Sequence, residues 1–134
     1  MTGVQTCALP ISCRKSGYQV GVAVVDRSGV LQVFLRDRFA GAHTARVAID
    51  KAWTAASFRQ ATADLATQTQ SGQAMSGLRN LPRFMAFGGG QPIQAAGSLV
   101  GAIGVSGAPG GEADDACAQA GVRAIADSLE LEAP

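Results

Sequence analysis

A chain of 134 residues is the usual size of a single domain, long enough to bury a core without disulfides or metal ions. Apolar residues make up 47% of the chain and charged residues 16%, a composition too apolar for a disordered chain. Apolar stretches such as residues 20–25 are far shorter than the roughly 20 residues that a membrane-spanning helix requires. Eleven basic and ten acidic side chains leave a formal charge of +1 with no basic cluster, so we expect neither a nucleic-acid partner nor a membrane span.

The first twelve residues (MTGVQTCALPIS) do not fit the pattern of the rest of the chain. They have neither the basic start nor the apolar run of a signal peptide. They resemble translated sequencing-adaptor read-through fused to a truncated gene, so we expect residues 1–12 to be non-native and residues 13–134 to form the domain. Because a signal peptide could have been lost with the original N-terminus, the compartment stays open between cytoplasm, periplasm and secretion.

The first half of the domain predicts a β-hairpin followed by a helix. Residues 19–26 (QVGVAVVD) and 30–36 (VLQVFLR) are rich in β-branched residues, and Gly29 between them can adopt the positive φ of a tight turn. From residue 43 to residue 59 the spacing becomes helical, with one face made of Ala45, Ala48, Ile49, Ala52 and Ala56. Such small side chains allow a helix axis to lie close to a sheet.

The second half predicts a weaker helix, an irregular segment, three short strands and a final helix with acidic residues in its first turn. In chain order these are residues 62–70, 76–83, 84–87, 92–95, 98–105 and 112–131. Strands and helices in this order predict an α+β fold, a mainly antiparallel sheet with helices packed on it.

The glycine-rich stretch at residues 101–111 (GAIGVSGAPGG) lies between a strand and a helix N-terminus, where an anion could bind. Its spacing matches neither the dinucleotide fingerprint nor the P-loop, and the acidic residues that follow would repel a phosphate. Ser106 lies in a near match to the nucleophile elbow, but residue 108 is Ala and nothing places the only histidine beside it. We interpret the stretch as a structural turn and assign no catalytic residue.

The loop at residues 36–44 (RDRFAGAHT) carries the residue types that a haem requires. A neutral imidazole at His43 can ligate iron, and the ring of Phe39 can cover a porphyrin face. The guanidinium groups that could pair with propionates belong to Arg36, Arg38 and Arg46. The alternative is that His43 and Thr44 cap the following helix while the arginines lie in solvent, and residue chemistry alone favours this simpler interpretation.

The chain resembles the GlcG/HbpS-like haem-binding family, which includes the C-terminal domain of PduO-type proteins, in the blocks VAVVDRSG, AGAHT, KAWTAASF, GGGQPI and GAIGVSGAPGGEADDACA. The resemblance runs from about residue 13 to residue 131. It implies a profilin-like α/β sandwich, a homo-oligomer, and binding of haem or a related tetrapyrrole, with haem sensing or degradation proposed for some members. Members begin with a helix, of which only residues 13–17 survive here.

Three classes of function follow from the resemblance. The leading hypothesis is a carrier or sensor module that binds haem b, non-covalently because the chain has no C-x-x-C-H motif. The second is enzymatic, either oxidative haem degradation or assistance to cobalamin adenosylation. The third is a structural oligomeric scaffold, for which the small-residue helix faces and glycine-rich loops are a sufficient explanation.

His43 is the expected iron ligand if haem binds, because axial ligation needs a donor with a free lone pair. Met75 and Met85 are weaker candidates, and Tyr18 leads directly into the first strand.

Cys13 and Cys117 are expected to lie near each other, since the remnant of the family's leading helix and the final helix would pack on one face of the sheet. A disulfide could then form in an oxidising compartment. The alternative is that Cys117 is a buried free thiol. Cys7 belongs to the suspect first segment and should have no partner.

Overall fold

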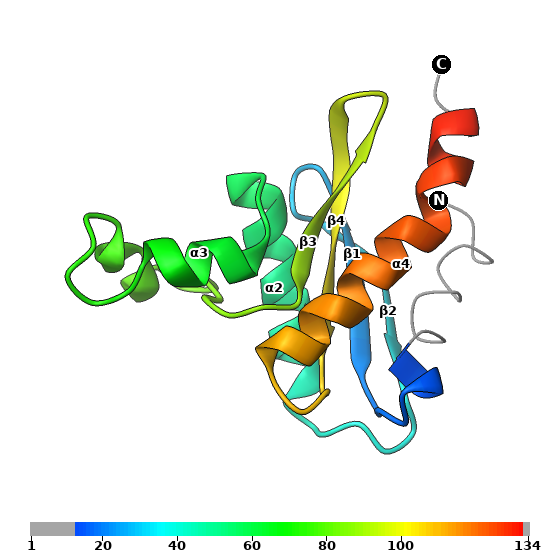
Figure 1. Cartoon of the computed structure of the whole chain (residues 1–134), viewed down its shortest axis with the longest axis horizontal. Coiled ribbons are helices and arrows are strands. Elements are labelled where there is room, and N and C mark those ends of the chain that lie inside the picture. The colour runs from blue at the N-terminus through cyan, green and yellow to red at the C-terminus, as the bar shows by residue number, and fades with distance from the viewer. Residues whose placement is uncertain (1–12, 133–134) are drawn as a thin grey trace.

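A four-stranded antiparallel sheet in the order β2-β1-β4-β3 forms the centre of the fold (Figure 1). The computed structural model describes residues 13–132, and the side chains of residues 13–124. The strands are β1 (Gly21–Asp26), β2 (Leu31–Arg36), β3 (Gly90–Ala95) and β4 (Ser98–Ser106). The suspect segment 1–12, with Cys7, lies outside the described residues.

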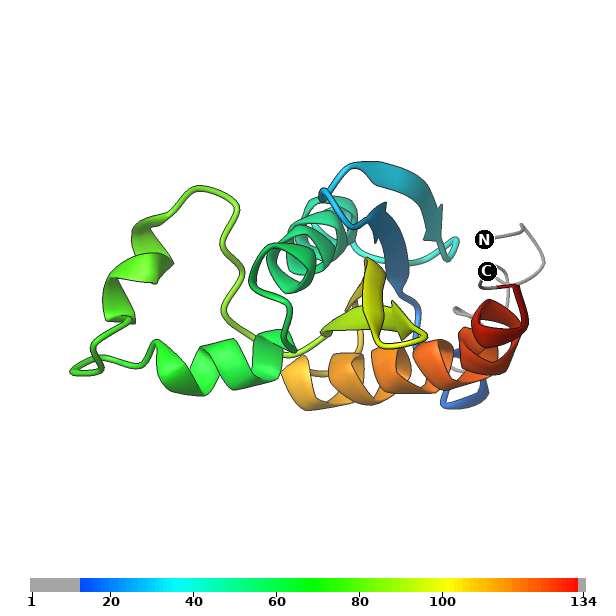
Figure 2. The same cartoon turned by 90° about the horizontal axis from the view of Figure 1, so that it is seen from above.

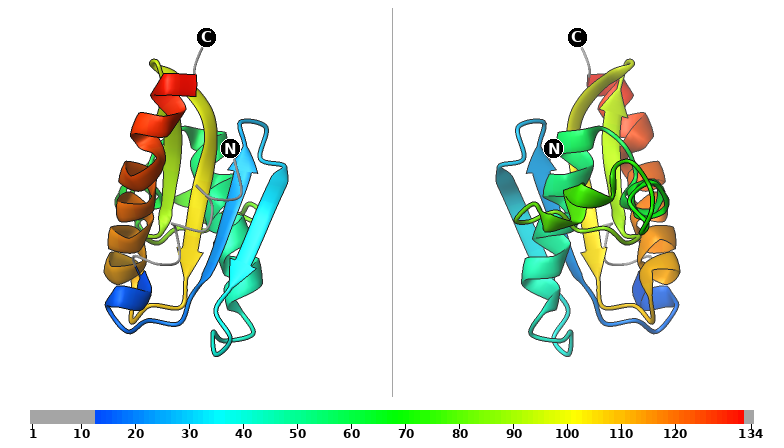
Figure 3. Two further views of the ribbon diagram at one scale, coloured as in Figure 1. Left: turned by 90° about the vertical axis from the view of Figure 1, so that its right-hand side faces the viewer. Right: turned by 90° about the vertical axis from the view of Figure 1, so that its left-hand side faces the viewer.

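Helices cover both faces of this sheet, which confirms the expected α+β sandwich (Figures 2 and 3). Helix α2 packs on one face against β1, β3 and β4, and α4 packs on the other against β3 and β4. Helix α3 and the short 3₁₀ helix η1 extend away from the sheet as an arm. The bounds are α2 (Thr44–Phe58), α3 (Thr62–Gln68), η1 (Ser76–Asn80) and α4 (Gly111–Glu132). None of the described helices is long and apolar enough to cross a bilayer.

Helix α2 lies very close to the sheet because both surfaces are made of small residues. A Cβ atom on Gly104 of β4 would collide with the carbonyl oxygen of Ala48 and lie 2.7 Å from the backbone nitrogen of Ala52. The predicted small-residue face of the helix is therefore confirmed. It forms one of two buried clusters, made of Ala23, Val25, Ala48, Ala52, Ala55, Ala56 and Ala102.

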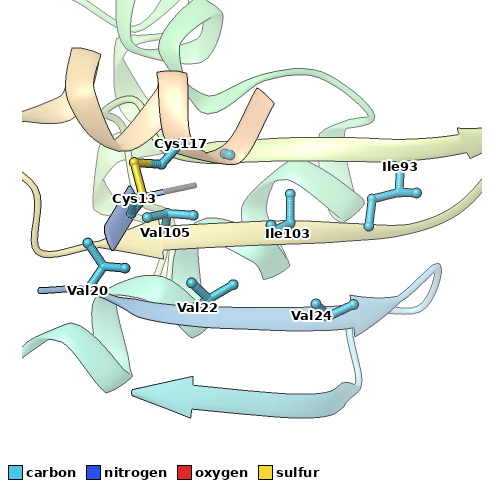
Figure 4. Packing of buried hydrophobic residues seen from close by; sticks show 9 residues of the cluster. Cys13, Val20, Val22, Val24, Ile93, Ile103, Val105 and Cys117 are labelled. Atoms are coloured by element: carbon cyan, nitrogen blue, oxygen red, sulfur yellow. A yellow bond between two sulfur atoms is a disulfide. The ribbon is translucent and has the colours of Figure 1, made fainter. Parts of the chain in front are cut away.

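The second cluster lies on the α4 side of the sheet and contains the disulfide between Cys13 and Cys117 (Figure 4). Its members are Cys13, Val20, Val22, Val24, Ile93, Ile103, Val105, Cys117 and Ala118. The Cα atoms of the two cysteines are 5.4 Å apart, within the range of a disulfide. The expected proximity is confirmed, and the alternative of a free buried thiol at Cys117 is wrong.

Two of the predicted elements differ from the structure. Residues 84–87 are not a strand, because the backbone N–H of Met85 donates to the Thr54 hydroxyl of α2 (3.1 Å) instead of to a neighbouring strand. Phe84 is buried with its ring edge-on to Phe58, at 5.3 Å between centroids. Within the segment predicted as irregular, Ser76–Asn80 form η1.

Candidate functional site

The loop between β2 and α2 is anchored at its first residue by Asp37, whose side chain is almost fully buried. The carboxylate accepts hydrogen bonds from the backbone N–H of Val20 (2.9 Å) and from Nε of Arg14 (2.6 Å). The Asp37 backbone N–H in turn donates to the Val20 carbonyl (2.9 Å). A buried carboxylate with these donors fixes where the loop leaves the sheet.

His43 ends this loop at the N-cap position of α2, and its exposed side chain makes no capping hydrogen bond. The imidazole lies against Gly41, where a Cβ atom would come within 2.8 Å of the ring. The Thr44 hydroxyl donates to the Gly41 carbonyl (2.7 Å) and so closes the turn. The alternative that the His43 side chain caps the helix is therefore wrong. Its ring nitrogens make no hydrogen bond with other described residues, and because the residue is exposed a ligand can approach the side chain.

A pocket of about 300 Å³ opens beside this imidazole, at the end of the sheet where the β2–α2 and β4–α4 loops lie, at the bottom of Figure 1. We call it the His43 pocket. Its walls come from both loops, from the segment before β3 and from the first turn of α4. The lining residues are Gly41, His43, Phe87, Ser106, Gly107, Ala108, Pro109, Gly110 and Asp114.

A buried ion pair lies behind this wall. The Lys51 ammonium of α2, fully buried, donates to the Asp114 carboxylate (2.8 Å) and to the Val105 carbonyl (2.9 Å), and it lies 4.1 Å from the centroid of the Phe87 ring. The other oxygen of Asp114 accepts from the backbone N–H of Ala108 (2.9 Å). The pair therefore joins α2, the end of β4, the β4–α4 loop and Phe87 into one rigid wall.

Burial lowers the pKa of the Lys51 ammonium below its ordinary value, and the hydrogen bond and charge of Asp114, together with the charge of Asp115, oppose part of this effect. The ammonium contacts three partners: the Asp114 carboxylate, the Val105 carbonyl oxygen and the face of the Phe87 ring. Its role in the pocket is to hold the wall in place, since the ammonium itself is out of contact with solvent.

Of the five residues expected to contact haem, His43 alone lines the pocket. Phe39 lies on the same loop with 76% of its surface exposed, and the Arg38 guanidinium is 5.4 Å from its ring centroid. Arg46 is exposed on α2 and lies 3.6 Å from the Asp50 carboxylate, and Arg36 is exposed at the end of β2. Met75 and Met85 lie outside the lining of the pocket.

Sequence reasoning missed Lys51, Phe87 and Asp114. A signal was present for Lys51, because it lies one helical turn from Ala48 and Ala55, beside the small-residue face of the predicted helix, and a buried cation needs a partner. The acidic residues at the start of the final helix are expected to favour the helix dipole and to repel a phosphate, and the structure shows that Asp114 is also the partner of Lys51. Ser106, in the stretch interpreted as a structural turn, is the buried last residue of β4 and lines the pocket.

A family model described as "Haem degrading protein HbpS-like" matches residues 6–123. The chain is 36% identical over 87 residues to an uncharacterised 15.0 kDa protein of the dhaT-dhaS intergenic region of Citrobacter freundii, covering 63% of this chain and 61% of that protein. It is 34% identical over 90 residues to the corrinoid adenosyltransferase PduO of the same organism, covering 66% of this chain and 27% of that protein. The chain thus spans less than two thirds of the length of either relative.

Solved structures share the fold over most of the chain. The Klebsiella pneumoniae protein ORFY has a TM-score of 0.86 at 30% identity, covering 90% of this chain and 84% of that one. A double mutant of Streptomyces reticuli HbpS has a TM-score of 0.83 at 36% identity, covering 90% of this chain and 81% of that one. PduOC in complex with haem has a TM-score of 0.84 at 30% identity, covering 93% of this chain and 94% of that one. The family match and the shared fold show that this chain belongs to the HbpS-like family.

Proposed function

We propose that this chain binds haem b non-covalently at the His43 pocket and acts as a carrier or sensor module. The observation that carries the proposal is the exposed side chain of His43 at a pocket whose lining residues also include Phe87. An imidazole nitrogen is a common axial ligand of haem iron, and an aromatic ring can cover the macrocycle. The solved complex of PduOC with haem, a relative of similar fold, supports the same ligand class.

The dimensions of the pocket indicate a haem that is only partly enclosed by one chain. At about 300 Å³ it is at the lower end of small-ligand pockets, so much of a macrocycle would protrude. Phe39, exposed on the adjacent loop, and a second copy of the chain are surfaces that could cover the remainder. Such partial enclosure supports the expected homo-oligomer. Sizing chromatography with light scattering would test it, and a monomer at micromolar concentration would count against it.

Bound haem supplies a redox-active iron, and the protein residues determine how it is held. In this proposal His43 would ligate the iron and Phe87 would contact the ring, while the Lys51–Asp114 pair holds the wall in place. Propionate pairing is the role proposed for Arg36, Arg38 and Arg46, all of them exposed. Replacing any one that pairs with a propionate by glutamine should weaken haem affinity about tenfold, from the loss of one charged hydrogen bond.

Haem titration of the full chain tests the proposal. The wild type should give a saturable Soret band, and His43→Ala should lose it or shift it. The control Gln73→Ala, at an exposed residue outside the pocket, should leave the band unchanged. An unchanged affinity and Soret maximum in His43→Ala would reject His43 as the ligand. Loss of the band with reductant and oxygen would favour haem degradation, and no binding at all would favour the scaffold.

A further inference from the structure

A second pocket, of about 480 Å³, lies at the opposite end of the sheet from the His43 pocket. It is formed where the β1–β2 turn and the β3–β4 turn, both at the upper end of the sheet in Figure 1, meet the C-terminal end of α2. The lining residues are Arg27, Ser28, Arg59, Gly97, Ser98 and Leu99. We call it the Arg27–Arg59 pocket. It shares no residue with the His43 pocket.

The charge of this pocket is positive. Neither Arg27 nor Arg59 forms a salt bridge with another described residue. The adjacent carboxylate, Asp26, is already engaged: one oxygen accepts from the backbone N–H groups of Ser28 (2.8 Å) and Val30 (3.0 Å), and the other from the Gln32 amide (3.2 Å). Two arginines therefore line one cavity, and its lining residues include no carboxylate.

The backbone at Arg59 is unusual in the same place. This C-cap residue of α2 has φ 56° and ψ 34°, a left-handed conformation that glycine or asparagine adopts at lower cost. Arg59 lines the pocket together with Arg27 of the β1–β2 turn.

We propose that the Arg27–Arg59 pocket binds a doubly charged oxyanion, the phosphoryl group or dicarboxylate of a small metabolite. Guanidinium groups pair with phosphate or carboxylate oxygens through two parallel hydrogen bonds, and the hydroxyls of Ser28 and Ser98 add donors from the two turns. The lining is mostly polar, which suits a small anion and not a macrocycle. This site is independent of haem binding at the other end of the sheet.

Calorimetric titration of the haem-free full chain with inorganic phosphate, and separately with succinate, tests the proposal. The measurement is made at about pH 8, where phosphate is a dianion, and at constant ionic strength. Fluorescence gives a second signal, because the only tryptophan, Trp53, packs against Gly29, which adjoins Ser28 in the pocket. Saturable phosphate binding alone supports a phosphoryl site, and saturable binding of succinate as well supports a general dianion site.

Three variants locate the binding. Arg27→Gln and Arg59→Gln should each weaken binding about tenfold through the loss of charged hydrogen bonds, and Arg123→Gln, at an exposed arginine on α4, should leave it unchanged. Glutamine at residue 59 meets the same backbone conformation, so the comparison isolates the charge. Absence of saturable binding of either anion, or equal binding in all variants, overturns the proposal. Haem titration of the Arg27→Gln/Arg59→Gln double variant should match the wild type, which separates this site from the His43 pocket.

Discussion

Replacing Lys51 by methionine should lower the free energy of unfolding by about 3–5 kcal/mol, because it leaves the Asp114 carboxylate buried without its cation. Methionine fills most of the space of the lysine stem, so the loss is mainly electrostatic. The ion pair is 2.8 Å long, the Lys51 side chain is fully buried and that of Asp114 is 4% exposed, so solvent cannot replace the missing charge. The Val105 carbonyl loses a donor as well. For a domain with about 5–15 kcal/mol of total stability, this is a large fraction.

A double-mutant cycle separates the pair from simple loss of packing. Asp114→Asn keeps an acceptor for the Ala108 N–H but leaves Lys51 without a counter-charge, so alone it should also destabilise strongly. The double variant Lys51→Met/Asp114→Asn buries no unpaired charge and should lose less than the sum of the two single changes. Lys15→Met, at an exposed lysine, is the matched control and should change stability by less than about 0.5 kcal/mol.

Urea unfolding measures these differences, at one chain concentration for all variants since an oligomer would make stability concentration-dependent. If the single changes prove additive in the double variant, the pair is not energetically coupled and the argument fails. A Lys51→Met variant no less stable than Lys15→Met would refute it equally.

Three further predictions concern the same fold. Because burial lowers the pKa of Lys51, the unfolded chain holds more protons at this residue than the folded chain does at alkaline pH. The free energy of unfolding of the wild type should therefore rise relative to that of Lys51→Met as the pH increases from the lowered pKa towards 10.5. A difference that falls over this range would contradict the prediction. Gly104→Ala should destabilise by about 1–3 kcal/mol or more through overpacking against α2, whereas Gly77→Ala, with open space around it, should not, as thermal unfolding would show. Replacing both Cys13 and Cys117 by alanine should cost about 2–5 kcal/mol in urea unfolding, and addition of reductant should then affect the wild type alone.

The sheet and its two main helices could be predicted because their signals are local. The hairpin follows from β-branched runs around Gly29, which has φ 81° in the structure, and α2 follows from helical spacing of small residues. Residues 84–87 also look like a strand in sequence, since two of the four are phenylalanine. Their backbone instead bonds a threonine hydroxyl of α2, a tertiary contact that no local pattern contains.

The site could be predicted only in part, because its residues are far apart in the chain. His43 was found since it is the only histidine and ends a loop with the right chemistry. Lys51 and Asp114 are 63 residues apart, and the local sequence around either residue does not predict that the two form a pair. A position beside the predicted buried face of the helix suggests that Lys51 needs a partner, but choosing among ten acidic residues requires the fold.

The glycines before the third strand have a packing role that sequence patterns do not reveal. In sequence, residues 88–90 only separate strands. In the structure a Cβ atom on Gly89 would come within 2.8 Å of the Lys51 ammonium, and one on Gly90 within 2.6 Å of the Lys51 carbonyl. The backbone can close over the lysine only because these positions lack side chains, and this closure keeps water from the ion pair. The buried ion pair therefore depends on these glycines, and the pocket wall that includes Phe87 depends on both.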